Sequence, residues 1–407
     1  MTLRLYSSLG REVREFKPVT PGHVKMYVCG VTPYDVTHLG HAFSYVQFDT
    51  LRRYLDSQGL QVRYVQNVTD IDDDMIMVSK RQGGRPISEI RDENDIIFRR
   101  DLDRLNVLRP SAYPYATDHI PEIIEATAKL IERGNAYEVD GDVFFSAKSF
   151  PRYGELNGLS FDALGKLENP ESKRVEKKRD HLDFLLWQIV DPGDPCWPSP
   201  WGLGRPGWSI ECTAMSVKHL GSQIDIHGGG SDLIYPHHEN EIAQAESAYG
   251  PAPFCPWWLH NGMLQLDGVK MSKSLGNLVL ARKLMEVFEP DHLRLYLLSN
   301  HLRKDANFHE GDMQKIAETY GNLKAAATSE AAGLAADPNS PVLAAFREAM
   351  DNDFDAPGAI SGLNAVATRV NGGSASEGEA PALRHGLSVL GFGFAGARGP
   401  ANGDLNP

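Results

Sequence analysis

Residues 25–68 read KMYVCGVTPYDVTHLGHAFSYVQFDTLRRYLDSQGLQVRYVQNV. The mostly apolar run at residues 25–31 predicts a strand, and residues 61–68 predict another. Between them, residues 42–57 carry apolar side chains at helical spacing, and Gly59 follows as a helix stop. A strand that returns parallel after one helix is nearly always a right-handed crossover. This stretch therefore predicts an α/β fold built on a doubly wound parallel sheet.

A second piece of the same fold lies far along the chain. Residues 223–227 predict a strand, residues 228–230 a glycine loop, and residues 236–249 a helix. The sheet is therefore expected to be split by an insertion. Beyond residue 300 the chain is rich in alanine at helical spacing, which predicts a C-terminal helical domain. The expected parts are a first catalytic half at 1–111, an insertion at 112–207, a second catalytic half at 208–300, a helical domain at 301–395 and a flexible tail at 396–407.

The composition is that of an ordinary globular protein. Of 407 residues, 42% are hydrophobic and 23% are charged, and no run of 18 apolar residues is present. The N-terminus lacks a charged start followed by an apolar stretch, so we expect no secretory signal, no membrane partner and a cytoplasmic location. Four cysteines are too few for a disulfide framework. The net charge of −13 argues against a general nucleic-acid coat protein but leaves room for a local RNA groove.

Two short motifs suit phosphate chemistry. His38 and His41 flank Gly40 where the first helix begins, and the free N–H groups of a helix N-terminus favour a phosphate. Residues 267–274 read DGVKMSKS, an Asp-Gly turn followed by a loop whose Lys270 and Lys273 suit a polyphosphate. Taken singly, the first motif is more often a pair of turn histidines and the second a surface loop.

Together, in this order and on opposite halves of a split α/β sheet, the two motifs resemble the signatures of class I aminoacyl-tRNA synthetases. The runs NVTDIDD at 67–73, GWSIEC at 207–212 and GGSDLIYPHHENE at 229–241 resemble the cysteinyl-tRNA synthetase branch, which also includes the mycothiol cysteine ligase. The similarity extends over about residues 3–390. It implies an enzyme that converts cysteine and ATP into cysteinyl adenylate and pyrophosphate.

The resemblance also implies roles for individual residues. As catalytic residues, His38 and His41 would contact the phosphates in the transition state, and Lys270 and Lys273 would hold the departing pyrophosphate. Gly40 would admit the adenine, and Asp232 would accept the ribose hydroxyls, although an Asp that caps the next helix fits the residues equally well. The positions that match the family's ATP site are Thr37, Gly40, Gly229, Asp232 and Lys273, and those that match its cysteine site are Cys29, Gly30, Thr69 and Trp208.

A metal site is indicated by spacing and by the resemblance. His237 and Glu241 are four residues apart on an expected helix and so share a face, as two ligands of one ion must. From spacing alone, each cysteine is more often a buried thiol than a ligand. The resemblance implies that Cys29 and Cys212 complete the ligand set of one zinc ion per chain. Zinc would bind the thiolate of substrate cysteine and reject serine.

Three features depart from the usual cysteinyl-tRNA synthetase pattern. Ser209 stands where the family has His in GWHIEC, which changes one expected donor of the substrate pocket. Residues 30–41 look closer to the mycothiol ligase. The chain also stops soon after the helical domain, so we expect no C-terminal anticodon-reading module. From Glu318 onward it holds five basic and ten acidic residues, a net charge of −5, which makes a poor RNA surface.

Other features favour the tRNA enzyme, above all the retained fourth ligand Glu241. The basic run at residues 173–179 is more often a solvated face than a phosphate contact. Cys196 and Cys255 are expected to be packing residues. The favoured function is therefore ATP-dependent activation of L-cysteine, with Mg²⁺, and its transfer to tRNA(Cys) by a monomer. The alternatives are an amide-forming ligase that joins cysteine to glucosaminyl-inositol, a small amino-sugar acceptor, and an inactive nucleotide-binding paralogue.

Overall fold

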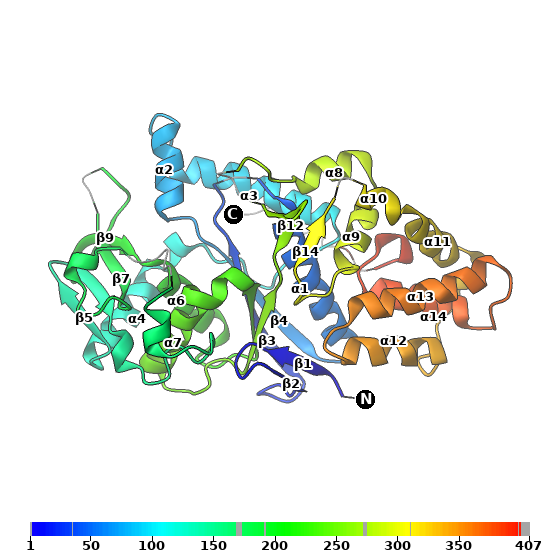
Figure 1. Cartoon of the computed structure of the whole chain (residues 1–407), viewed down its shortest axis with the longest axis horizontal. Helices are drawn as coiled ribbons and strands as arrows, with labels where there is room; N and C mark the ends of the chain where they lie inside the picture. The colour runs from blue at the N-terminus through cyan, green and yellow to red at the C-terminus, as the bar shows by residue number, and fades with distance from the viewer. Residues whose placement is uncertain are drawn as a thin grey trace.

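The centre of the molecule is a four-stranded parallel sheet in the order β11-β10-β3-β4 (Figure 1). The computed structural model describes residues 2–34, 36–167, 173–190, 193–271, 275–309, 311–397 and 399. Two strands come from each half of the chain, which confirms a parallel α/β sheet split by an insertion. The strands are β3 (His23–Val31), β4 (Gln61–Val68), β10 (Ile226–Gly230) and β11 (Trp257–Asn261).

Both faces of the sheet are covered by helices. Alternate side chains of a strand point to opposite faces. Met26 and Val28 of β3 pack in one core with α1 (Leu39–Ser57), whereas Tyr27 and Cys29 pack in a second core with α6 (Trp208–Leu220). This double burial explains why residues 25–31 are nearly continuous in apolar character.

The second half of the sheet differs locally from the sequence expectation. The strand β10 begins at Ile226 and includes all three glycines, which we had expected to form a loop. A π-helical turn at Ile234–His238 leads directly into the helix α7 (Glu239–Tyr249), and only Tyr235 has a non-helical backbone, so the helix expected at 236–249 is confirmed. Gly250 follows it with a positive φ, as the helix stop requires. His237 therefore lies in the turn and Glu241 on the helix.

The insertion forms its own antiparallel sheet, at the left of Figure 1, with α4 (Ile120–Glu132) packed against it. Residues Ala112 and Tyr115 pair with β4, so they extend the edge of the central sheet. The short helix α5 (Phe161–Leu164) lies between the strands in sequence. The five strands are β5 (Ala136–Val139), β6 (Asp142–Phe145), β7 (Phe184–Ile189), β8 (Trp197–Ser199) and β9 (Gly202–Pro206).

The basic run lies mostly exposed, as expected, and some of its cations also make contacts within the insertion. Lys177 bonds buried Asp142 at 2.7 Å, and Arg174 donates to the carbonyl of Ile189 at 3.1 Å. Lys173 contacts Asp73, at the start of α2 (Asp73–Arg81). Three of its cations therefore hold the insertion together and join it to α2.

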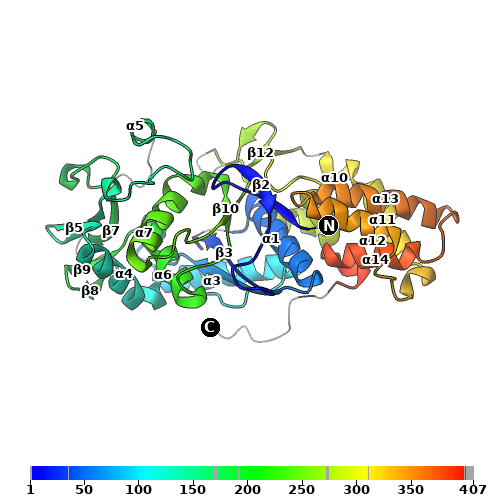
Figure 2. The ribbon, with the colours of Figure 1, turned by 90° about the horizontal axis from the view of Figure 1, so that it is seen from below.

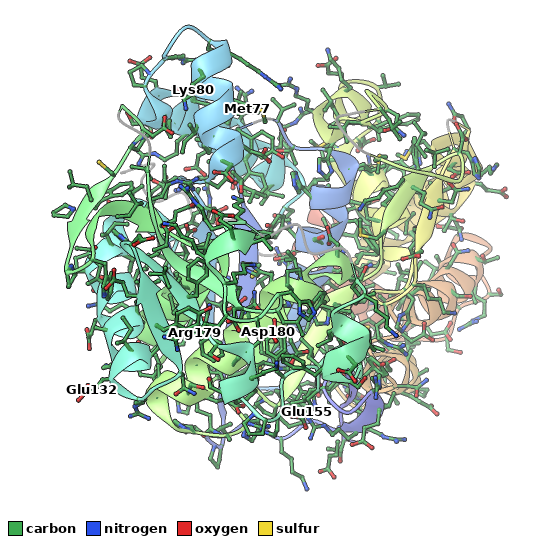
Figure 3. All side chains as sticks on the ribbon, turned by 60° about the vertical axis from the view of Figure 1, so that its left-hand side comes forward. Met77, Lys80, Glu132, Glu155, Arg179 and Asp180 are labelled. Carbon is green, nitrogen blue, oxygen red and sulfur yellow. The ribbon has the colours of Figure 1, made fainter. Side chains whose placement is uncertain are left out.

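An arm of two helices, α2 and α3 (Ile87–Arg104), rises from the end of β4 (Figure 1). Seen from the side of the insertion, Met77 and Lys80 lie on this arm above Arg179 and Asp180 (Figure 3). Lys80 bonds Asp194 of the insertion at 2.7 Å. Ion pairs therefore join the arm to the insertion.

Smaller strands flank the central sheet. The sequence analysis missed the N-terminal hairpin of β1 (Arg4–Ser7) and β2 (Glu12–Glu15). The expected Asp-Gly turn is confirmed: it joins β12 (Leu264–Leu266) to β13 (Val269–Lys270), and β12 also pairs with β14 (Ala306–Phe308).

The C-terminal third is helical, as expected, and forms the right-hand end of the molecule (Figures 1 and 2). Of the expected tail, only residues 396, 397 and 399 are described. Among the described residues, no helix is long and apolar enough to cross a membrane. The helices are α8 (Ala281–Val287), α9 (Pro290–Leu298), α10 (Asp312–Lys315), α11 (Ala317–Ala327), α12 (Pro341–Asp351), α13 (Ala356–Asn371) and α14 (Glu379–Val389).

A buried arginine joins this helical region to the nucleotide-type sheet. Arg294 of α9 is fully buried and donates to Asp49 of α1 at 2.5 Å. It also donates to the carbonyls of Leu105 and Leu390. Burial would raise the pKa of Asp49, but Arg294 and Arg53 outweigh it, and the pKa of this carboxyl lies below its usual value of 3.8. The ion pair therefore fixes α1 against the helical domain.

We expect Arg294→Leu to lower the free energy of unfolding by about 3–5 kcal/mol, because it removes one of the two cations that pair with the buried Asp49 carboxylate and leaves only Arg53. The loss should shrink below the unfolded pKa of Asp49, 3.8, since that carboxyl stabilises the fold only while it is ionised. Denaturant unfolding followed by circular dichroism measures the change. Asp49→Asn in the same chain should recover part of the loss, and a cost below about 1 kcal/mol for the single variant would contradict the role.

Candidate active site

A cavity of about 350 Å³ opens at the carboxyl ends of β3 and β10, where α/β sheets of this kind bind ligands. Strands from both halves of the chain and the β12–β13 hairpin contribute to its walls. Most of the expected site residues meet here: Cys29, Gly30, His38, Gly40, His41, Trp208, Gly229, Asp232 and Lys270. Their convergence from distant parts of the sequence makes this the candidate active site.

His38 and His41 lie at the first turn of α1. The Nδ1 atom of His38 accepts the backbone N–H of His41 at 3.3 Å, so His38 is the N-cap of the helix. The two rings stack with centroids 3.6 Å apart. Both imidazoles therefore line the cavity beside the positive end of the helix dipole, which favours an anionic ligand.

Two glycines bring backbone close to the cavity. A Cβ on Gly30 would lie 1.5 Å from the carbonyl oxygen of Asn67, so no side chain fits between β3 and β4 at this position. A Cβ on Gly40 would lie 3.0 Å from the ring of His38. Gly30 is thus required by strand packing, whereas Gly40 leaves room beside the histidine pair.

Lys270 reaches the cavity from a tight hairpin. Asp267 and Gly268 form the two-residue turn with φ values of 50° and 79°, a conformation that glycine adopts readily and Asp tolerates. Lys270 itself is exposed on β13 and lines the cavity. Lys273, the other lysine of this motif, lies outside the described residues.

Two expected site residues are placed differently. Thr37 and Thr69 are buried, and neither is among the residues that line the cavity in the described part of the chain. Asn67 donates to the hydroxyl of Thr69 at 3.1 Å, so this threonine is tied to the end of β4. Asp232 is exposed and lines the cavity.

A buried cluster of metal-type ligands adjoins the cavity. Cys29, Cys212, His237 and Glu241 each offer one ligand atom, and these atoms all lie within 4.8 Å of one another. The Sγ atoms of the two cysteines are 3.7 Å apart, and His237 Nε2 lies 3.3 Å from Glu241 Oε1. All four residues are nearly inaccessible to solvent, so the cluster has the donors and the enclosure of a metal centre.

Three further histidines support the cluster, and the sequence analysis missed them. His227 bonds Glu241 at 2.9 Å, and His238 approaches Cys29 at 3.3 Å while bonding His260 at 2.7 Å. Burial lowers the pKa of His227 and of His260 to about 3, so both rings are neutral at pH 7. His227 and His238 also form a second four-atom set with Cys29 and Glu241. In the sequence, His227 directly precedes the triple glycine and His238 directly follows His237, whereas His260 has neither signal.

The thiols are held in two different protonation states. A hydrogen bond from Cys29 lowers the pKa of Cys212 to about 6, although burial opposes this shift. Burial raises the pKa of Cys29 well above its usual range. One thiolate is thus already favoured at neutral pH, which lowers the cost of binding a cation at this cluster.

Trp208 and Ser209 begin α6 on opposite sides. The Trp208 ring lies 4.2 Å from that of His237 and is partly exposed to the cavity. Ser209 is buried and accepts a hydrogen bond from Gln244 at 3.0 Å, so it joins α6 to α7 and is not part of the cavity lining.

Cys255 is buried as expected, but Cys196 is exposed, so the expectation that it packs in the core is wrong.

Comparison with known proteins agrees with this geometry. The family model of the class I (C) tRNA synthetase catalytic domain matches residues 15–318. A cysteine–tRNA ligase of Shewanella loihica is 45% identical over 370 residues, which cover 91% of this chain and 80% of that protein. One from Pelotomaculum thermopropionicum is 44% identical over 387 residues, covering 91% of this chain and 78% of the relative.

Solved structures match the fold at low sequence identity. Methionyl-tRNA synthetase of Mycobacterium tuberculosis, in complex with methionyl-adenylate, superposes with a TM-score of 0.64 at 18% identity, over 92% of this chain and 90% of that one. A leucyl-tRNA synthetase of Agrobacterium radiobacter gives a TM-score of 0.64 at 11% identity, over 93% of this chain and 85% of that one. With its split parallel sheet, its two phosphate-type motifs and its relatives over most of its length, the chain belongs to the class I aminoacyl-tRNA synthetases, in the cysteine–tRNA ligase family.

Proposed function

We propose that this protein activates L-cysteine with ATP and transfers the cysteinyl group to tRNA(Cys). The observation that carries the proposal is the position of the Cys29, Cys212, His237 and Glu241 cluster beside the cavity that holds the histidine pair and Lys270. A site that can bind a thiol group therefore adjoins a site that suits a triphosphate. The relatives named as cysteine–tRNA ligases support the same activity.

The cluster fits zinc. With Zn–S bonds of 2.3 Å, two thiolates of a tetrahedral site lie about 3.8 Å apart, and a nitrogen and an oxygen ligand lie about 3.3–3.4 Å apart. The observed separations are 3.7 Å between the sulfurs and 3.3 Å between His237 Nε2 and Glu241 Oε1. The four side chains would hold one zinc ion, which supplies a thiol-selective binding position for the substrate.

The protein's own residues would select cysteine by enclosing that position. Cys29, Trp208 and Gly30 line the cavity next to the cluster, and Thr69 is hydrogen-bonded to Asn67 at the end of β4. A substrate thiol loses its proton readily near a cation, whereas a serine hydroxyl is harder and less acidic. Discrimination would therefore rest on sulfur chemistry and needs no large difference in pocket size.

Activation would depend on positioned cations. The cysteine carboxylate attacks the α-phosphate of ATP, and negative charge accumulates on the phosphates. His38, His41, Lys270 and Lys273 would stabilise that charge, with Mg²⁺ accompanying ATP. Gly40 and Gly229 give the nucleotide close access to the backbone, Asp232 would accept the ribose hydroxyls, and buried Thr37 would shape the wall behind the histidines.

The acceptor and the oligomeric state complete the proposal. We infer that the enzyme acts as a monomer on tRNA(Cys). The relatives' names favour tRNA over the small amino sugar glucosaminyl-inositol. The two acceptors differ in chemistry, because tRNA receives an ester at a ribose hydroxyl and the amino sugar receives an amide.

The first prediction concerns the metal. We expect about one zinc ion per chain in wild-type protein, and its loss in Cys212→Ser and in His237→Ala, because each removes a ligand. Cys255→Ser is the matched control, since Cys255 is equally buried but outside the cluster, and it should keep the ion. Metal analysis of the purified proteins decides this. Zinc-free wild-type protein that still rejects serine would disprove the role of the cluster.

The second prediction concerns activation. Wild-type enzyme should catalyse cysteine-dependent ATP–pyrophosphate exchange, and Lys270→Ala and Lys273→Ala should each lower its rate about 10²–10³-fold, because a cation aimed at transition-state charge is lost. Lys283→Ala serves as control, since Lys283 is exposed on α8 and paired with Glu286. Radiolabelled pyrophosphate incorporation gives the rates. Wild-type exchange by both loop variants would rule out the proposed lysine loop.

The third prediction concerns the acceptor. Enzyme supplied with cysteine and ATP should charge tRNA(Cys), and charging should weaken as salt rises, because phosphate contacts release counterions. Glucosaminyl-inositol offered in parallel should give no amide. Acid-gel analysis of the tRNA and mass spectrometry of the small product separate the cases. Active exchange without tRNA charging, together with amide formation, would replace the proposed acceptor by the amino sugar.

A further inference from the structure

The two cysteines of the metal-type cluster lie in direct contact. The Sγ atoms of Cys29 and Cys212 are 3.7 Å apart. Cys29 comes from β3 and Cys212 from α6, and both side chains belong to one buried core. A covalent S–S bond is about 2.05 Å long, so the two sulfurs would have to approach one another by less than about 2 Å to form one. Side-chain rotation supplies a movement of that size.

The two sulfurs differ in their access to small molecules. Cys29 is 7% exposed and lines the first cavity, whereas Cys212 is 1% exposed. A second cavity, of about 440 Å³, shares the wall at Trp208 with the first, and in the described part of the chain Cys212 lines neither of the two. A small oxidant that enters the first cavity therefore meets Cys29, and Cys212 lies within reach of the oxidised sulfur.

The other two cysteines are placed differently. Cys196 is exposed on the insertion, and the buried Sγ of Cys255 lies 3.5 and 3.3 Å from two backbone carbonyl oxygens. Within the described residues, Cys29 and Cys212 are the cysteine pair whose sulfurs touch. The structure therefore provides one preformed dithiol, and it coincides with two ligands of the cluster.

We propose that Cys29 and Cys212 form an oxidation-sensitive pair, which a hydroperoxide converts into a disulfide with loss of the zinc ion. The inference goes beyond the proposed function and rests on it only for the identity of the ion. A metal holds its cysteine ligands as thiolates, and the thiolate is the form of cysteine that oxidants attack.

The oxidation takes two steps. The Cys29 thiolate attacks one oxygen of hydrogen peroxide, so that an S–O bond forms, the O–O bond breaks and hydroxide leaves with the electron pair. The Cys212 thiolate then attacks the sulfur of this sulfenic acid, the S–S bond forms, the S–O bond breaks and a second hydroxide leaves. The two thiolates together lose two electrons, and the peroxide takes up both.

The disulfide would empty the cluster. Two of the four ligand atoms become disulfide sulfurs, which carry no charge for a cation. The remaining ligands, His237 and Glu241, already lie 3.3 Å apart and can bond to one another without an ion. A tetrahedral site with two ligands left holds zinc weakly, so the thiol-selective position is lost. The oxidised protein would thus stop activating cysteine when oxidants also consume the free thiol.

The test uses the double variant Cys196→Ser/Cys255→Ser in the zinc-loaded full-length chain, beside wild type. The chain holds four cysteines, so the variant keeps only Cys29 and Cys212, and any disulfide within one chain joins these two. Neither replaced residue belongs to the cluster, so the variant should keep wild-type ATP–pyrophosphate exchange. Hydrogen peroxide is added in a concentration series. A chromophoric chelator measures released zinc, and mass spectrometry of unreduced peptides measures the disulfide.

We expect one zinc ion released per disulfide formed, and exchange lowered at least about 10-fold, because two of four ligands are lost. Dithiothreitol with added Zn²⁺ should restore the exchange, since a disulfide is reducible. The same variant with Cys212→Ser added lacks the second thiol. Its Cys29 should form no disulfide within the chain and should proceed to sulfinic acid, which dithiothreitol does not reverse.

Release of zinc without a disulfide between Cys29 and Cys212 would overturn the inference. So would two free thiols in the cluster at peroxide concentrations that oxidise the exposed Cys196 of wild type. Purified wild-type protein without zinc would instead refute the metal assignment of the proposed function. The unreduced peptides would still decide whether the two thiols pair, so the two failures are distinguishable.

Discussion

The parallel pairing of β3 with β10 is the contact on which the site depends. It sets Met26, Tyr27 and Val28 opposite Ile226, His227 and Gly228, although the two segments are about 200 residues apart in the chain. Because parallel strands end at the same edge of a sheet, Cys29 and the triple glycine arrive together at the mouth of one cavity. A slip of one residue would turn Cys29 toward α1 and away from Cys212.

The metal-type cluster is held in place by hydrogen bonds from neighbouring polar side chains. Glu241 has one carboxylate oxygen toward His237 and the other toward His227, so its orientation is fixed from two sides. His238 is fixed in turn by His260, which bonds Ser8 near the N-terminal hairpin. Such supporting hydrogen bonds orient ligands before a metal binds and keep their rings neutral. The N-terminal hairpin, which carries no ligand, thereby contributes to the shape of the site.

The sequence supplied much of the candidate site because its chemistry is local in two places. The histidine pair is the first turn of one helix, and the lysine motif follows one two-residue hairpin, so spacing alone puts those groups beside a helix end and a turn. Prediction from the sequence failed where residues that are neighbours in the chain have side chains that point to different places. Ser209 follows Trp208 directly, yet one side chain packs between helices and the other lines the cavity. The basic run is largely exposed, as expected, but its pairing with buried Asp142 was not expected, because that partner lies on another strand.

The sequence by itself determined the βαβ unit, the split of the sheet, the helical C-terminal region and the residue types of the ligand set. These follow from hydrophobic periodicity and from motifs whose meaning is short-range. Only the tertiary structure decided that His227 and His238 form a second ligand set with Cys29 and Glu241, and that two cavities share the wall at Trp208. Those outcomes depend on the register of strands and the packing of helices that are distant in sequence. A distance of a few ångströms across such a contact is fixed by the whole core and not by local spacing.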